Sequence, residues 1–205
     1  MADTKERILH TALRLFSING YEAVSVSDIA DELGITKGAL YRHYRNKRDI
    51  FDSILARMEQ RDAEQAVAHH LPEGTLAEMG QAYQSAAVDQ IIAFSRAMFR
   101  YWTQDDFAAR FRRMLTLEQY RSGEMGKLYQ QYLASGPLDY LADLFAAMGM
   151  ARPREKAAAC YAPMFLLYSV YDGAADQESV LRLLDQCMEN VRQSLPRASD
   201  APGSV

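Results

Sequence analysis

The sequence has few cysteines and no long apolar run, and these two absences narrow its class. Its 205 residues include two cysteines, Cys160 and Cys187, which lie far apart and are predicted to be buried, unreactive thiols rather than part of a disulfide framework. The apolar run YAPMFLLYSVY is shorter than the roughly 20 residues that a membrane-spanning helix needs. No apolar segment follows the opening residues MADTKERILH, so we expect no secretory signal, no membrane partner and a cytoplasmic location.

Catalytic motifs are also absent from the sequence. The four histidines offer no cluster, because His69 and His70 are adjacent and would point to different faces of a helix, while His10 and His43 lie far from them. Neither an HExxH motif, nor a nucleophile elbow, nor a glycine-rich phosphate loop occurs. The sequence therefore predicts a protein that is not an enzyme and that holds no metal and no cofactor.

Positive charge is in deficit over the whole chain but concentrated in one stretch. The net charge is −4, so a surface that binds nucleic acid would have to be a local patch. The segment ITKGALYRHYRNKRDIF, residues 35–51, has no acid between residues 36 and 48 and contains five bases: Lys37, Arg42, Arg45, Lys47 and Arg48. Most basic stretches are solvated helix faces, so the structural context decides what this one does.

Helical periodicity predicts an all-α protein. Nearly every segment places apolar residues three or four positions apart, and no alternating stretch bounded by turn residues indicates a strand. In the first helix, Ile8, Ala12 and Phe16 form an apolar stripe that ends at Asn19 and Gly20. This helix would pack the stripe against the segments that follow.

The next two helices are predicted to form a helix-turn-helix. Ser25 and Asp28 have the spacing of a capping box, which opens a short helix that the following glycine ends. Thr36 can cap a third helix, which we expect to run to Tyr44 with Leu40 on its inner face. Two short helices joined by a turn that contains glycine make this motif, and its second helix enters the major groove of DNA.

The basic residues lie where such a motif would meet DNA. Gly38 lies in the first turn of the third helix at a cost of roughly 1 kcal/mol relative to alanine, which a close backbone approach would explain. Lys47 and Arg48 lie in the first turn of a fourth helix that Asn46 can cap, where the helix dipole disfavours cations. A phosphate bound there would reverse that penalty.

Residues 7–51, RILHTALRLFSINGYEAVSVSDIADELGITKGALYRHYRNKRDIF, resemble the DNA-binding domain of the TetR/AcrR family of bacterial transcriptional regulators. The pattern A..LF...G precedes V.DIA...G...G.LY.HF..K..I, and only Tyr44 departs from it, at the position where phenylalanine is common. The resemblance implies a homodimer of all-helical subunits that binds palindromic, double-stranded operator DNA and a small-molecule effector. By position, it implies DNA contacts from Thr36, Lys37, Gly38, Tyr41, His43 and Lys47.

The remainder of the chain is rich in aromatic residues and methionine. Such a cluster fills a core in most proteins, but many buried Tyr and Trp side chains together also suit an apolar cavity with polar handles. We therefore predict an effector site lined by Met98, Tyr101, Trp102, Phe111, Met114, Tyr120, Tyr129 and Tyr168.

The last predicted helix has more apolar surface than a solvent-facing helix requires. Pairing with a second subunit would bury it. The family resemblance likewise implies an interface built from the last two helices. The predicted interface residues are Val180, Leu184, Cys187, Met188 and Val191.

The sequence therefore predicts three regions. Residues 1–48 would be the helix-turn-helix domain, residues 49–196 a helical ligand-binding and dimerisation domain, and residues 197–205 a disordered tail. The predicted function is that of a ligand-responsive regulator, a repressor that a small, largely apolar or aromatic molecule releases from its operator. The alternative is a helical adaptor that binds only protein, which a gel shift with DNA would separate from a regulator.

Overall fold

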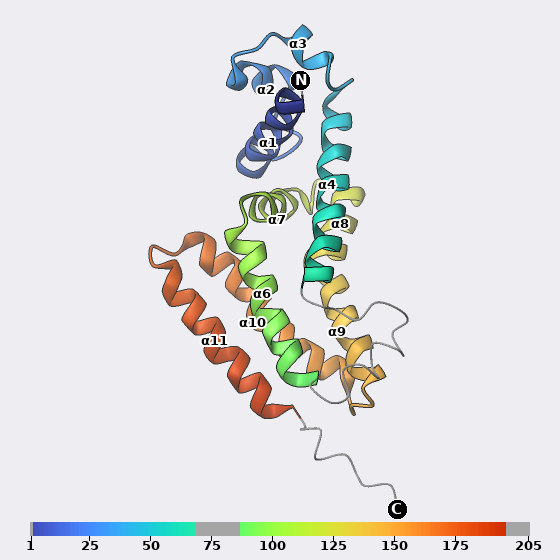
Figure 1. The fold of residues 1–205 in the computed structure, drawn as a ribbon, viewed down its shortest axis with the longest axis vertical. Helices are drawn as coiled ribbons and strands as arrows, with labels where there is room; N and C mark the ends of the chain where they lie inside the picture. Colours follow the sequence, from blue (N-terminus) through green and yellow to red (C-terminus); the bar gives the residue numbers. More distant parts are fainter. Residues whose placement is uncertain (1, 69–86, 196–205) are drawn as a thin grey trace, which may run out of the picture. The chain divides into compact units, whose positions relative to one another are not determined.

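The structure is a computed structural model that describes residues 2–68 and 87–195. These residues form helices and no strand, which confirms the predicted all-α fold (Figure 1). The chain divides into two compact units. The first comprises Met1–Ala68 and Gln104–Tyr129, and the described part of the second comprises residues 87–103 and 130–195.

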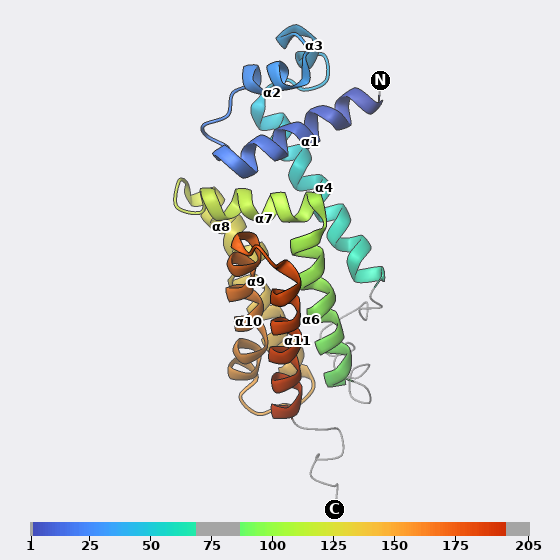
Figure 2. The same ribbon diagram turned by 90° about the vertical axis from the view of Figure 1, so that its left-hand side faces the viewer.

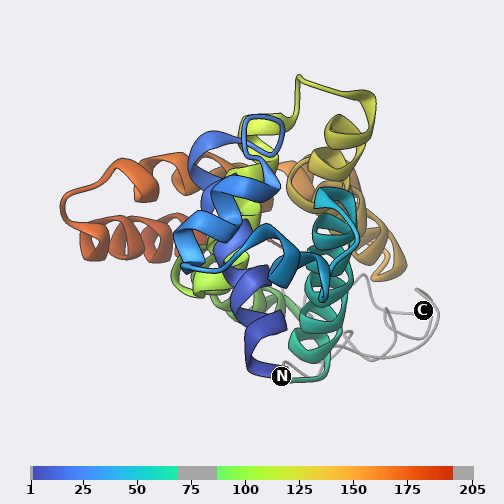
Figure 3. The ribbon, with the colours of Figure 1, turned by 90° about the horizontal axis from the view of Figure 1, so that it is seen from above.

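The N-terminal helices of the first unit pack around one apolar core. Three helices form this part of the unit: α1 (Ala2–Asn19), α2 (Val26–Leu33) and α3 (Lys37–Tyr41). α2 packs on α1, and α3 packs on α2 (Figure 3). The predicted inward-facing residues are fully buried, namely Ile8, Ala12, Phe16 and Leu40, and so is Ile29 of α2.

The caps of this motif match the sequence prediction, but the length of its second helix does not. The Ser25 hydroxyl accepts from the Asp28 amide at 3.2 Å, and the Asp28 carboxylate accepts from the Ser25 amide at 2.7 Å. The Thr36 hydroxyl accepts from the Ala39 amide at 3.1 Å. α3 ends at Tyr41 rather than at Tyr44, and the amides of His43 and Tyr44 both donate to the Leu40 carbonyl in the turn that follows. The predicted end at Tyr44 is corrected.

Two further helices, α4 and α7, belong to the first unit, and α8 begins in it. α4 (Lys47–Ala68) is capped by Asn46, whose Oδ1 accepts from the Asp49 amide at 2.8 Å, as the sequence predicts. α7 (Asp106–Glu118) packs along α1 (Figure 2). α8 (Gly123–Leu133) starts in this unit, and its last residues belong to the second unit.

The second unit is a helical bundle. Its helices are α6 (Ala87–Gln104), whose last residue lies in the first unit, α9 (Ser135–Ala147), α10 (Pro153–Gly173) and α11 (Gln177–Ser194). α10 packs on both α9 and α11, and α11 runs back beside α10 (Figure 1). Within residues 2–68 and 87–195, no helix has the length and apolar character that crossing a membrane requires.

From the segments GMARP and DGAAD, the sequence also predicts helix breaks at residues 149–153 and 172–176, and both are confirmed. The breaks near Gly149 and Asp172 separate α9 from α10 and α10 from α11. The break between α6 and α7 was not predicted, although Asp105 caps α7 by accepting from the Ala108 amide at 2.9 Å. The segment LPEGT predicts a further break at residues 71–75. This break and the predicted tail at residues 197–205 lie outside the described residues.

The predicted boundary between residues 48 and 49 does not coincide with the division into compact units. α4 is one helix from Lys47 to Ala68, so its first turn and its remainder belong to the same unit. As a division between a DNA-binding and a ligand-binding function, the boundary stays a prediction.

Gly20→Ala should destabilise the fold more than Gly34→Ala. Both glycines have a positive φ, +86° and +67°, so alanine at either position costs roughly 1–2 kcal/mol of backbone strain. A Cβ at Gly34 would meet open space, whereas at Gly20 it would overlap Oε1 of Glu118, which is fully buried and has little room to move. Thermal unfolding of the two variants checks this, and equal losses of Tm would contradict it.

Asp62→Asn should raise the stability of the chain above pH 7. Burial raises the pKa of the Asp62 carboxyl to about 7, which the Arg61 charge offsets only in part, and Oδ1 accepts no hydrogen bond from the described residues. Between about pH 4 and pH 7 the folded chain keeps a proton that the unfolded chain has lost, so stability falls as the pH rises. Asparagine removes that loss. The Tm difference between variant and wild type should therefore shrink towards pH 4, and a difference that is constant with pH would contradict the account.

Candidate DNA-binding site

α3 presents one exposed face and one buried face. Thr36, Lys37, Gly38 and Tyr41 are exposed, whereas Leu40 is fully buried against the core. Four of the six predicted DNA-contacting residues are therefore accessible on α3 and its N-cap.

The two remaining predicted residues, His43 and Lys47, are half-buried. Nζ of Lys47 donates to the Tyr21 carbonyl at 2.8 Å and to the Glu22 carbonyl at 3.3 Å, and it lies 4.3 Å from the centre of the Tyr21 ring. An ammonium group has three N–H donors, so a phosphate contact by Lys47 would use the third. This side chain thus ties the α1–α2 connection to the start of α4, a role that the sequence did not reveal.

Tyr44 is a core residue of the helix-turn-helix. Its side chain is 2% exposed, and its hydroxyl donates to the Lys5 carbonyl at 3.3 Å. Burial raises the pKa of this phenol to about 12, so it stays neutral at physiological pH. Tyrosine at this position is a buried aromatic core residue, as phenylalanine would be, and it adds a hydrogen bond to α1.

The basic residues fall into two groups by their partners. Within the described part of the chain, neither Lys37 nor Arg42 forms an ion pair, so their charges are available to an anion. Arg45 instead pairs with Asp49, with Nη2 3.5 Å from Oδ1, and its backbone amide lowers the pKa of the Asp49 carboxyl. The positive surface therefore centres on α3 rather than on the whole basic stretch.

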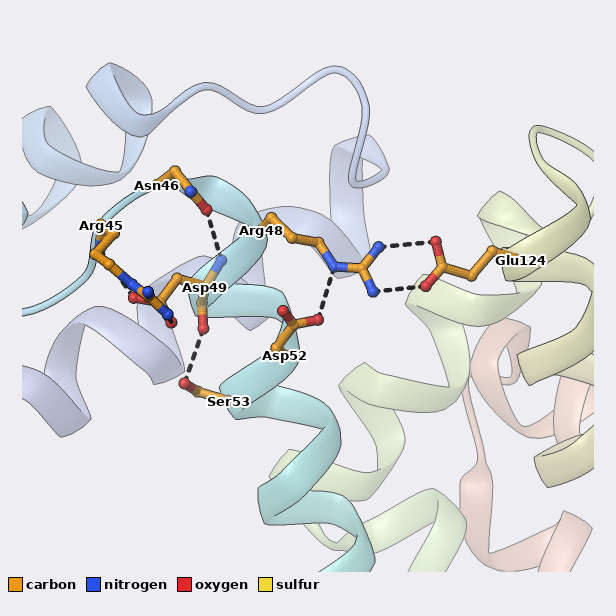
Figure 4. A network of polar contacts seen from close by, with 7 residues as sticks. All are labelled: Arg45, Asn46, Arg48, Asp49, Asp52, Ser53 and Glu124. Atoms are coloured by element: carbon orange, nitrogen blue, oxygen red, sulfur yellow. Dashed lines mark hydrogen bonds and ion pairs between the residues drawn. The ribbon is translucent and has the colours of Figure 1, made fainter.

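Arg48 is held by two carboxylates (Figure 4). Its Nε donates to Asp52 Oδ1 at 2.7 Å, and its two terminal nitrogens donate to the two carboxylate oxygens of Glu124 at 2.8 and 2.6 Å. The pairing with Asp52 could have been found in the sequence from its i, i+4 spacing on a helix. No sequence signal connects Arg48 to Glu124, which lies 76 positions away.

The predicted effector-site residues are divided between the two units. Met98, Tyr101, Trp102 and Tyr168 belong to the second unit, and Phe111, Met114, Tyr120 and Tyr129 belong to the first. Tyr120 is 91% exposed, so the prediction that it lines a cavity is corrected, since its position between α7 and α8 leaves it facing solvent. Phe111 and Met114 are fully buried. The assignment of the other residues to an effector site stays a prediction.

The second unit contains an aromatic cluster on α6 and α10. Phe99 stacks on Tyr168 with ring centres 5.1 Å apart, and it meets Tyr171 edge-on at 6.1 Å. Trp102 meets the ring of Tyr132 at 6.4 Å. The hydroxyl of Tyr161 donates to the Leu133 carbonyl at 2.8 Å. These contacts give α6, α8 and α10 a shared aromatic core with polar groups at its edge.

The predicted dimer interface is corrected by the burial of its residues. Four of them are core residues of their own chain, with exposures between 0 and 8%: Val180, Leu184, Met188 and Val191. α11 turns this stripe inward, and Arg96 of α6 reaches it through an ion pair with Asp185 at 3.0 Å. Cys187 is half-buried and is the only one of the five with partial exposure.

A different apolar surface of these helices faces solvent. We call it the α10–α11 patch, and it consists of large apolar side chains that are 43–65% exposed: Phe165, Leu166, Val170 and Leu183. Phe165, Leu166 and Val170 lie on α10, and Leu183 lies on the helix that packs beside it. The apolar residues of this patch are visible in the sequence, but the more regular apolar stripe on α11 was predicted to be the interface.

Comparisons of the sequence locate one family-specific region. Residues 8–54 match the model of the bacterial regulatory proteins of the tetR family. The HTH-type transcriptional regulator AcrR of Shigella flexneri is 44% identical over 52 residues, which are 25% of this chain and 24% of that protein. The alignment thus spans about a quarter of this curated relative.

Comparisons of the structure cover more of the chain. The fatty acid degradation regulator FadR from Bacillus halodurans superposes with a TM-score of 0.61 at 14% identity, over 93% of this chain and 95% of that chain. The transcriptional regulator FadR from Bacillus subtilis, solved in complex with stearoyl-CoA, gives a TM-score of 0.61 at 16% identity, over 93% and 99%. At these identities, the similarity establishes a shared fold.

Proposed function

We propose that this chain is a repressor of the TetR/AcrR family of bacterial transcriptional regulators and that it binds palindromic duplex DNA as a homodimer. The observation that carries this proposal is the exposed face of α3. There Lys37 and Tyr41 are exposed, and Lys37 forms no ion pair with a described residue. Repression is proposed because related proteins are named as repressors.

In the proposed complex, α3 lies in the major groove. Lys37 and Tyr41 can reach base edges or phosphates, and the absence of a side chain at Gly38 lets the helix backbone approach the DNA closely. Thr36 caps α3, so its hydroxyl already accepts a hydrogen bond and can donate one to a phosphate oxygen. Contacts of this kind position the helix on the backbone while Lys37 and Tyr41 read sequence.

We propose that the homodimer forms through the α10–α11 patch. Exposed apolar groups on adjacent helices are costly to hydrate, and pairing with the same surface of a second copy buries them symmetrically. Leu166 is 65% exposed and lies one helical turn from Val170, so the two side chains share one face of α10. A two-fold dimer places two copies of α3 on successive half-sites of a palindrome, about one helical turn or more apart.

We further propose that a small, largely apolar or aromatic effector binds the second unit and lowers the affinity for DNA. The support is the aromatic cluster around Phe99, Trp102 and Tyr168, together with the Bacillus subtilis relative that was solved with stearoyl-CoA. An effector shifts the equilibrium only by its difference in affinity for the two conformations of the protein. Met98 and Tyr101 would add a flexible and a polar element to its site.

Selection of DNA from a randomised duplex pool tests the proposed function. The wild-type chain is expected to enrich one palindromic sequence, with a stoichiometry of two chains per duplex in sedimentation. Recovery of no preferred sequence would contradict the proposal and would favour a helical adaptor that binds only protein.

A further inference from the structure

The first turn of α4 is held on two sides by its two cations. Lys47 bonds to the carbonyls of Tyr21 and Glu22 in the α1–α2 connection, and Arg48 bonds to Glu124 in the first turn of α8. Adjacent residues on a helix point about 100° apart, so the two side chains reach different neighbours. All of these residues belong to the first compact unit.

The contact between Arg48 and Glu124 has a defined geometry. Two parallel hydrogen bonds of 2.8 and 2.6 Å join the guanidinium to the carboxylate, and the Nε bond to Asp52 fixes the third edge of the same group (Figure 4). Such a fork restricts both distance and direction, which a single ion pair does not. The Arg48 hydrogen bonds also hold the pKa of the Glu124 carboxyl below its usual range, so the pair stays charged at neutral pH.

Stability alone is a weak reason for this network. The side chains of Arg48, Asp52 and Glu124 are each about half exposed, and exposed ion pairs contribute little to folding. What the fork does supply is a fixed position for the first turn of α4. That turn follows α3 after only five intervening residues, 42–46, so its position sets where α3 can lie.

We propose that Glu124 is a positioning residue for DNA binding, acting through Arg48 to hold the start of α4 and, with it, the helix-turn-helix. This inference rests on the proposed function. Glu124 lies outside residues 8–54, so the region that matches the family model does not contain it. When Glu124 is neutralised, Arg48 keeps partners on its own helix, Asp52 and the ring of Phe51, and loses this hydrogen-bonded link between α4 and α8.

The expected consequence is a loss of selectivity rather than of general DNA affinity. A palindrome fixes the separation of the two reading helices, so a loosely held α4 weakens binding to the selected duplex. Random duplex is bound mainly through charge and tolerates many placements of α3. Glu124 therefore affects the ratio of the affinity for the selected duplex to the affinity for random duplex.

A double-mutant cycle on the full-length chain tests this proposal. The variants are Glu124→Gln, Arg48→Gln and the double variant. Each is titrated with two DNA probes: the duplex that the wild type selects from a randomised pool, and a random duplex. Glu124→Gln should weaken binding to the selected duplex by at least about fivefold and leave the random duplex and the salt dependence unchanged. Arg48→Gln should lose a similar amount of selectivity, and the double variant should lose no more than either single variant.

Glu178→Gln is the matched control, because Glu178 is also the second residue of a helix and is exposed, but it lies on α11. It should behave as the wild type. Tighter binding by Glu124→Gln with a salt slope steeper by about 0.9 would instead mean that Glu124 competes with a phosphate for Arg48, and would overturn the proposal. So would unchanged selectivity or additive losses in the cycle. If the wild type selects no sequence, the proposed function itself fails, which is a distinct outcome.

Discussion

Leu184→Asp is expected to unfold the second unit, whereas Leu183→Asp, one position earlier on the same helix, should leave it folded and abolish self-association. Leu184 is fully buried, so aspartate there loses the apolar contacts and buries an unpaired charge, at a cost of several kcal/mol. Leu183 is 44% exposed in the α10–α11 patch, and aspartate there remains hydrated in the monomer. It would be desolvated only in a dimer.

Circular dichroism and sedimentation separate these two effects. Leu183→Asp should keep the helical circular dichroism signal and unfold cooperatively on heating, and it should sediment at half the mass of the wild type. Leu166→Asp, on the other helix of the patch, should do the same. A folded dimer formed by both patch variants would move the interface elsewhere, and a folded Leu184→Asp chain would contradict the inward orientation of α11.

The sequence could not predict which of the two leucines faces its own core and which faces outward. A stripe such as Val180, Leu184 and Val191 establishes that one face of a helix is covered, but not whether its own chain or another chain covers it. Both partners are equally apolar, so periodicity cannot distinguish them. Burial in the structure assigns the stripe to the chain's own core.

The caps of the helix-turn-helix, in contrast, were predictable because each cap is a local interaction. The capping residues Ser25, Thr36 and Asn46 bond to amides three positions along the chain, so a short segment contains the whole interaction. The fork between Arg48 and Glu124 joins distant segments and leaves no such local signal. The carbonyl partners of Lys47 were also hidden, because backbone groups occur at every position.

The second large effect is expected at α3: Lys37→Glu should lower the affinity for the selected duplex by at least about a hundredfold. Loss of a basic contact to a base or phosphate costs roughly 1–3 kcal/mol, and a dimer loses it in both half-sites. The new carboxylate would also face the phosphates and repel them. Because Lys37 is exposed and forms no ion pair with a described residue, the fold should be unaffected.

Lys127→Glu provides the control for charge alone. Lys127 is an exposed residue of α8, and its substitution changes the net charge by the same amount as Lys37→Glu. Its affinity for the selected duplex should stay close to that of the wild type. A comparable loss in both variants would show that the whole-molecule charge, and not the face of α3, controls binding.

One measurement tests most directly whether α3 binds DNA. It is the fluorescence anisotropy of the labelled, selected duplex, titrated with the wild type and with Lys37→Glu across a series of salt concentrations. For the wild type, we expect the logarithm of the affinity to fall linearly with the logarithm of salt concentration, and the selected duplex to bind about a thousandfold or more tightly than random duplex. Lys37→Glu should lose most of this preference and show a shallower slope. Equal affinity of the wild type for both duplexes, or a Lys37→Glu chain that binds as the wild type does, would contradict the assignment of α3 as the DNA-reading helix.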